Sequence, residues 1–426
     1  MDIWHFGSET TTTRITTDGT SSREQHMKRA FVGSTRFAGA CATLATLSLC
    51  AAAAHADNYV PPGGTIAYAL DSMHWAIYLP PHSARNNAIN KAECPDGFNL
   101  GPRTEFDQLF PKSGYRTIVG TRLRYESEVW NPTTAPDPFA YHEGGGQIAQ
   151  GLDLDGKTGP NDLTGPDGQK SIDNQLYRAI GCVESFRPGV NANDYFDDQE
   201  IGTDNYNRLL IEITGVTSLE NSPHVEVTTY RGLEPLLASA AGKGYLPGGT
   251  EQIDTRFGRR YIQHWQGKIV NGVLTTEPSN FDYPWASLGV AVDEFMYAAR
   301  FQLKLTPTTA EGLIGGYADI ASWYLQSNQE STHHQAYGAL SSPSVYKALM
   351  RLADAYPDPK TGANTAISGA LRAKFVQVFV IHPSNAALEA ALSPPLKPYA
   401  GTPFSPPRSE QALARAPHRG RAFQGD

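Results

Sequence analysis

Five aspartates lie close together in a glycine- and proline-rich stretch, residues 151–182, which we call the aspartate segment. They are Asp153, Asp155, Asp162, Asp167 and Asp173. Calcium is bound in proteins by carboxylate and carbonyl oxygens, and crowded carboxylates repel one another unless a cation neutralises them. We therefore predict that these aspartates are the ligands of a calcium ion.

The spacing of the first three aspartates partly matches the calcium-binding loop of an EF-hand. That loop has oxygen ligands at positions 1, 3, 5 and 12 and a glycine at position 6. If Gly156 is position 6, Asp153 and Asp155 occupy positions 3 and 5. Asp162 then occupies position 12, but position 1 is Gly151, which has no side-chain ligand. The alternative is a plain turn-rich loop, because Asp-Gly and Pro-Asp-Gly are common turn sequences.

A second candidate binding site is formed by His142 and Glu143, which precede a run of three glycines. Glycines at this point would let a ligand approach the backbone closely, although a flexible turn also explains them. The sequence contains no serine-hydrolase elbow, phosphate-binding loop, dinucleotide fingerprint or zinc-protease motif. Catalytic residues therefore stay unknown.

Paired carboxylates could instead belong to a secreted hydrolase that acts on polysaccharide, because glycosidases place two acids across the bond they cleave. The candidate acids are Glu126, Glu128, Glu143 and Asp293. The first two share one face of an expected strand over residues 121–130, roughly 7 Å apart. Charges on one face of a strand are more typical of a solvated surface. We therefore favour an exported binding or structural protein and keep the hydrolase as the alternative.

Residues 27–56 have the organisation of a secretory signal peptide. Basic residues precede an apolar run of small residues that ends in Ala-His-Ala, so cleavage after Ala56 is expected to leave Asp57 first. Residues 1–26 are polar and rich in threonine, which predicts that translation starts at Met27. The apolar run is too short for a membrane anchor. We expect a periplasmic or secreted protein without a transmembrane segment in its mature chain.

Cleavage would leave two cysteines, Cys94 and Cys182. In an oxidising compartment such a pair most often forms a disulfide, and neither residue lies in a pattern typical of a catalytic thiol. A formal net charge of −8 without basic blocks argues against a nucleic acid as partner.

Short segments that alternate apolar and polar residues dominate the mature chain and predict strands. They are residues 65–70, 74–79, 121–130, 205–214, 224–230, 268–276, 295–305, 312–317 and 375–381. One helix is expected from Pro343, with Ser342 as its cap, to Tyr356. This pattern predicts a mainly β fold, mostly antiparallel and of the β-sandwich or jelly-roll type, with a few helices and long loops.

The expected domain organisation is a single β-rich domain over residues 57–383. Two subdomains with a break near 235–250 are the alternative, since the length allows either. Residues 384–426 are rich in proline, alanine and arginine with little to bury, which predicts a disordered tail.

Parts of the aspartate segment resemble uncharacterised exported proteins of Gram-negative bacteria. The resemblance lies in Leu-Asp-Leu-Asp-Gly at 152–156, Gly-Pro-Asp-Gly at 165–168 and the run from Ile172 to Cys182. It implies an extracytoplasmic location and no particular reaction.

Overall fold

The computed structural model describes most of the chain between residues 59 and 384. The described residues are 59–79, 93–99, 124–125, 128–129, 141–183, 186–187, 201–202, 208–241, 244–257, 259–287, 290–324 and 342–384. All of them belong to the second of two units, Ala54–Asp426, and the first unit is Met1–Ala53. The expected signal peptide and the expected C-terminal tail lie outside the described residues.

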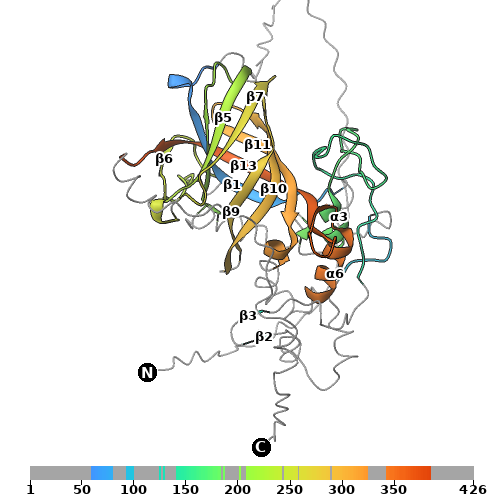
Figure 1. The fold of residues 1–426 in the computed structure, drawn as a ribbon. Coiled ribbons are helices and arrows are strands. Elements are labelled where there is room, and N and C mark those ends of the chain that lie inside the picture. Colours follow the sequence, from blue (N-terminus) through green and yellow to red (C-terminus); the bar gives the residue numbers. More distant parts are fainter. Residues whose placement is uncertain are drawn as a thin grey trace, which may run out of the picture. The chain divides into compact units, whose positions relative to one another are not determined.

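Eight strands pair edge to edge and close into a barrel (Figure 1). In order around the barrel they are β1 (Ile66–Trp75), β4 (Leu209–Thr214), β5 (Asn221–Arg231), β7 (Gln263–Val270), β8 (Val273–Thr276), β10 (Val290–Leu305), β11 (Thr309–Asp319) and β13 (Asn364–Ile381). Each neighbouring pair is antiparallel, and β13 pairs back onto β1 to close the ring.

The expectation of a sandwich or jelly roll is therefore wrong, although the mainly antiparallel β class is right. In a sandwich β1 would lie in one of two stacked sheets. Here β1 pairs with β4 on one side and with β13 on the other. Closure pairs every barrel strand on both edges, which removes exposed sheet edges. The alternation of apolar and polar residues is the same in both architectures, so it could not separate them.

Shorter strands extend this sheet. They are β6 (Gly249–Gln252), parallel to β13, β9 (Ser279–Ser287), antiparallel to β10, and β12 (Ala355–Pro357), antiparallel to β13. A separate two-stranded sheet consists of β2 (Arg124–Tyr125) and β3 (Glu128–Val129), which pair with each other. The expected single strand over 121–130 is thus wrong, because Arg124–Tyr125 and Glu128–Val129 pair antiparallel with each other.

Two other sequence expectations can be compared directly with the strands. Two separate strands were expected over residues 65–70 and 74–79. Residues 66–70 and 74–75 instead belong to the single strand β1, which has an irregularity between Leu70 and Ser72, and residues 76–79 are not in a strand. The hairpin over 268–276 is confirmed as β7 and β8. Asn271 and Gly272 form its turn with φ values of 50° and 75°, as a two-residue Asn-Gly turn requires.

The barrel interior is filled with side chains. Trp265 contacts Phe281 and Phe301 edge to face, with ring centroids 5.6 and 5.0 Å apart. Its indole N–H donates to the Ala299 carbonyl at 3.1 Å, so the buried polar atom is satisfied. These rings and the aliphatic side chains around them form one buried cluster. An eight-stranded barrel is just wide enough to be filled in this way.

Two helices pack together and against β13: α3 (Gln175–Ile180) and α6 (Ser342–Leu352) (Figure 1). Leu176 of α3 lies over Gly369, where a Cβ atom would be 3.1 Å from the leucine side chain. α6 ends at Leu352, before the Tyr356 expected from the sequence, and Tyr356 belongs to β12 with φ 55°. No helix of the described part is both long and apolar enough to cross a membrane.

Candidate metal site

The aspartate segment folds back on itself before it enters α3. Isolated bridges join Leu163 to Ile172 and Leu152 to Asp173, both antiparallel. The Asp173 N–H donates to the Leu152 carbonyl at 2.9 Å. This pairing places Asp173 beside the first two aspartates of the segment, although many residues separate them along the chain.

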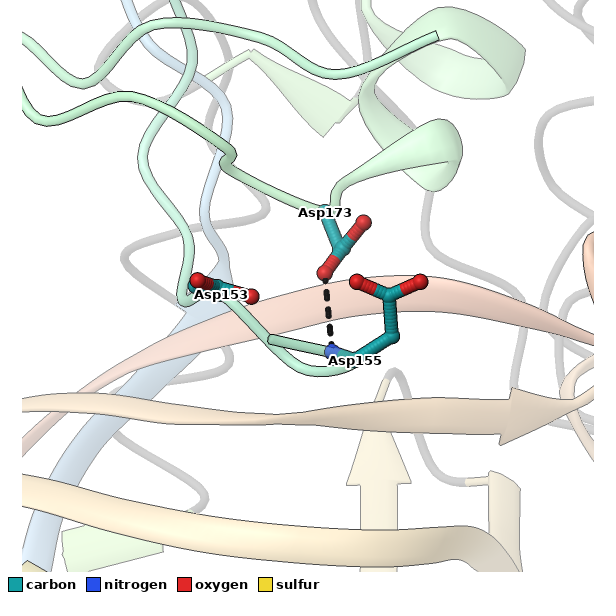
Figure 2. A group of neighbouring side chains, drawn as sticks. All are labelled: Asp153, Asp155 and Asp173. Atoms are coloured by element: carbon teal, nitrogen blue, oxygen red, sulfur yellow. Dashed lines mark hydrogen bonds between the residues drawn. The ribbon is translucent and has the colours of Figure 1, made fainter. Parts of the chain in front are cut away.

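Three carboxylates therefore come together: those of Asp153, Asp155 and Asp173 (Figure 2). One oxygen of each lies within 4.8 Å of the others, which is close enough for all three to bind one cation. Asp153 and Asp173 are half-buried, and Asp155 is exposed. The three carboxylates could therefore hold one metal ion.

Backbone amides hold the three carboxylates in place. The Asp173 carboxylate accepts from the N–H of Leu154 at 2.7 Å. It also accepts from the N–H of Asp155 at 3.3 Å, the bond drawn in Figure 2. Asp153 accepts from the Gly156 N–H at 2.7 Å, and Asp155 from the Lys157 N–H at 2.8 Å. Backbone N–H groups of the turn at residues 154–157 thus orient all three carboxylates, although Asp173 itself lies outside this turn.

The electrostatics of the cluster favour the neutral form of one acid. Burial raises the pKa of Asp173 to about 6, and the charges of Asp155 and Asp162 raise it further against the two backbone hydrogen bonds. Burial also raises the pKa of Asp354, and the charge of Asp155 contributes. A cation next to these groups would favour their charged forms.

The segment is anchored to the outer face of the barrel. The Arg300 guanidinium of β10 donates to the carbonyls of Asp153 at 2.9 Å and Leu154 at 2.7 Å. Leu152 lies against Gly315 of β11, where a Cβ atom would be 2.9 Å from the leucine side chain. The carbonyl oxygens of Asp153 and Leu154 already accept hydrogen bonds from Arg300. We therefore expect the three carboxylates and water, rather than these carbonyls, to be the ligands of an ion.

The other two aspartates lie outside the three-carboxylate cluster. Asp162 accepts from the Gly159 N–H at 2.6 Å, and it remains near enough to act on the pKa of Asp173. Asp167 accepts from the Gln169 N–H at 3.0 Å, as expected for a Pro-Asp-Gly turn. The EF-hand spacing thus identified two members of the cluster, whereas Asp173 replaces Asp162 as the third.

His142 and Glu143 contact different parts of the molecule. The Glu143 carboxylate accepts from Arg351 of α6 at 2.9 Å. The His142 N–H donates to the side chain of Asn99 at 2.8 Å. A shared ligand for this pair stays a prediction.

The expected disulfide between Cys94 and Cys182 is present, with 5.6 Å between the two Cα atoms. A buried ion pair lies beside it, in which Arg187 donates to Glu93 at 2.8 Å. The bridge ties residues 93–99 to the end of α3, directly after the aspartate segment leaves the cluster.

The acids of the alternative hydrolase do not form a pair in the described residues. Asp293 forms an ion pair with Arg260 at 2.6 Å and accepts a hydrogen bond from Tyr261. Glu143 forms an ion pair with Arg351. The side chains of Glu126 and Glu128 lie outside the described part of the structure.

Two residues near the cluster were missed by the sequence analysis, Arg300 and Asp354. Arg300 lies in the expected strand over 295–305, where alternation puts it on the polar face with Gln302 and Lys304, and this was its only signal. Nothing in the local sequence of Asp354 indicates that it approaches Asp155.

Comparison of the chain with protein-family models, with curated proteins and with solved structures finds no match. The function is therefore argued from the fold and the site.

Proposed function

We propose that this protein is an exported, non-enzymatic β-barrel protein that binds calcium at Asp153, Asp155 and Asp173. The convergence of these three carboxylates on one point carries the proposal. The ion would neutralise the like charges and hold the aspartate segment against β10 and β11. Its role would then be structural, in support of a binding surface on the barrel.

The donor chemistry favours calcium among biological cations. Carboxylate oxygens are hard ligands, whereas zinc and copper sites use histidine or cysteine. Calcium accepts six to eight oxygens in irregular geometry, and magnesium demands a near-ideal octahedron. The three carboxylates here are held by backbone hydrogen bonds of one turn, and the less demanding geometry of calcium makes it our choice.

The disulfide supports the exported location. Structural disulfides persist in oxidising compartments and are rare in the cytosol, and Cys94 and Cys182 are both buried. The predicted signal peptide over 27–56 is consistent with the same compartment. The resemblance to exported proteins of Gram-negative bacteria leads us to propose the periplasm or the extracellular space.

Thermal unfolding tests the calcium site. Binding to the folded state alone stabilises it by about 2.7 kcal/mol when free calcium is about a hundredfold above the dissociation constant. We expect the melting temperature to rise with calcium and fall with chelator, and the response to be lost in Asp155→Ala. Asp167→Asn is the matched control, because Asp167 belongs to the same segment but lies outside the cluster, and it should respond like the wild type. A wild-type melting curve that does not change with chelator would leave the cluster as a turn without a metal.

A further inference from the structure

A pocket of about 410 Å³ lies between the aspartate segment and the barrel. Side chains of β10, β11 and β13 form its floor, and residues between 150 and 172 form its wall. The floor is the outer face of the barrel, since Gln302 and Lys304 alternate with the buried Leu303. None of the three clustered aspartates lines the pocket.

Cross-strand pairing arranges the floor in two rows. One row contains Lys304, Glu311 and Lys374, and the other contains Gln302, Leu313 and Arg372. In the first row a carboxylate lies between two ammonium groups. The second row, in which Arg372 lies, has a cation and no acid.

Arg372 is half-buried, and its side chain makes no hydrogen bond or ion pair with the described residues. Two acids line the pocket, Glu311 on the floor and Asp167 on the wall. Three cations line it as well, Lys304, Arg372 and Lys374. The pocket therefore carries one net positive charge. A guanidinium in a pocket without a carboxylate partner among the described residues is a site at which an anion is favoured.

The remaining lining is suited to an organic molecule. Leu313 and Pro166 offer apolar surface, and the side-chain amide of Gln302 can donate or accept a hydrogen bond. The volume lies within the usual range for small-molecule sites, about 300–1,000 Å³. An inorganic anion would leave most of this space and its apolar surface without contact.

We propose that the pocket binds a small organic carboxylate. Arg372 binds the carboxylate group through its planar fork of donors, and the apolar part of the ligand packs on Leu313 and Pro166. The proposal rests on the proposed role as a binding protein and names its ligand class, but it does not require calcium at the aspartate cluster.

The test uses the full exported chain and two probes of the same shape, 2-naphthoate and the uncharged 2-naphthamide, in calorimetric titrations. We expect 2-naphthoate to bind with a dissociation constant of about 1 mM or below, as is usual for a ligand of this size. The amide and the Arg372→Gln variant should each weaken binding by about tenfold or more. Lys268→Gln changes an exposed cation of β7 that does not line the pocket, and it should bind like the wild type.

A second variant, Leu313→Trp, fills the pocket with a residue that strands accept readily and should abolish binding while the melting temperature stays near the wild-type value. The proposal is overturned if 2-naphthoate does not bind at about 10 mM, or if the amide binds equally well. It is also overturned if Arg372→Gln or Leu313→Trp binds 2-naphthoate with the wild-type affinity.

Titrations in calcium and in chelator separate the pocket proposal from the calcium proposal. Binding of 2-naphthoate in chelator supports the pocket even if calcium leaves the melting curve unchanged, and a calcium response without 2-naphthoate binding supports the cluster alone.

Discussion

Glu294 is an acid enclosed in the protein interior, 1% exposed. One of its oxygens accepts a hydrogen bond from the Tyr283 hydroxyl at 3.2 Å, and the other has no partner among the described residues. Burial raises its pKa from 4.5 to about 8, and the charge of Asp319 acts in the same direction. This side chain is therefore held neutral in the folded protein near pH 7.

The raised pKa of Glu294 predicts a pH dependence of stability. Between pH 4.5 and about 8 the unfolded chain releases this proton and the folded chain keeps it, so the contribution of Glu294 to stability falls as pH rises. Glu294→Gln removes the titration. We expect the variant to match the wild type near pH 4.5 and to exceed it at pH 8 by on the order of 2–5 kcal/mol, measured by urea unfolding. Equal pH profiles for the two proteins would show that Glu294 is not the group responsible.

At the scale of elements, one strand residue anchors the aspartate segment. Arg300 projects from β10 and donates to two consecutive carbonyls of the segment. These contacts place the turn that carries Asp153 and Asp155, while the bridge between Leu152 and Asp173 brings in the third carboxylate. The cluster thus depends on a strand distant in sequence as well as on its own loop.

Arg300→Met should keep the aliphatic part of the side chain and remove both hydrogen bonds. We expect a loss of about 1–3 kcal/mol, the usual range for hydrogen bonds to a charged group, and a weaker calcium response. Hydrogen exchange at the Gly156 and Lys157 amides should become faster, because their acceptors belong to the same turn. Lys268→Met, an exposed cation on β7, is the control. If Arg300→Met has the same amide exchange rates and the same stability as Lys268→Met, Arg300 does not anchor the aspartate segment.

The sequence predicted parts of these elements well and others poorly, for a physical reason. The Asn271-Gly272 turn is local, so its residues alone determine the hairpin. The alternation of residues along β10 and β13 gives the faces of each strand, but it carries no information on which strands pair. Closure depends on β1 meeting β13, at opposite ends of the described chain. All five aspartates were predicted as metal ligands, and the EF-hand spacing placed Asp162 with Asp153 and Asp155. Spacing alone could not show that the chain returns to bring Asp173, and not Asp162, into the cluster.

At the scale of the whole molecule, the disulfide joins two segments that are far apart in sequence. Cys94 lies in residues 93–99, and Cys182 follows α3 directly. Tyr177 and Ile180 of this helix belong to the core of the barrel. Breaking the disulfide should therefore affect both α3 and the part of the aspartate segment that precedes this helix.

The paired substitution of Cys94 and Cys182 by alanine should destabilise the protein by about 2–5 kcal/mol, the usual cost of losing a native disulfide. Both changes are made together so that no free thiol is left. Chemical denaturation of the double variant and of the reduced wild type should agree with each other. A loss below about 0.5 kcal/mol in both would show that the bridge contributes little to the fold.

Direct measurement of calcium stoichiometry tests the central claim most closely. Equilibrium dialysis of the wild type near pH 7.5 should find one calcium ion bound per chain, and Asp173→Asn should lose it, because Asp173 is one of the three clustered carboxylates. Binding should weaken towards pH 5, since Asp173 takes up a proton below its raised pKa of about 6. The account is contradicted if the wild type binds no calcium at millimolar concentration, or if Asp173→Asn binds it as tightly as the wild type does.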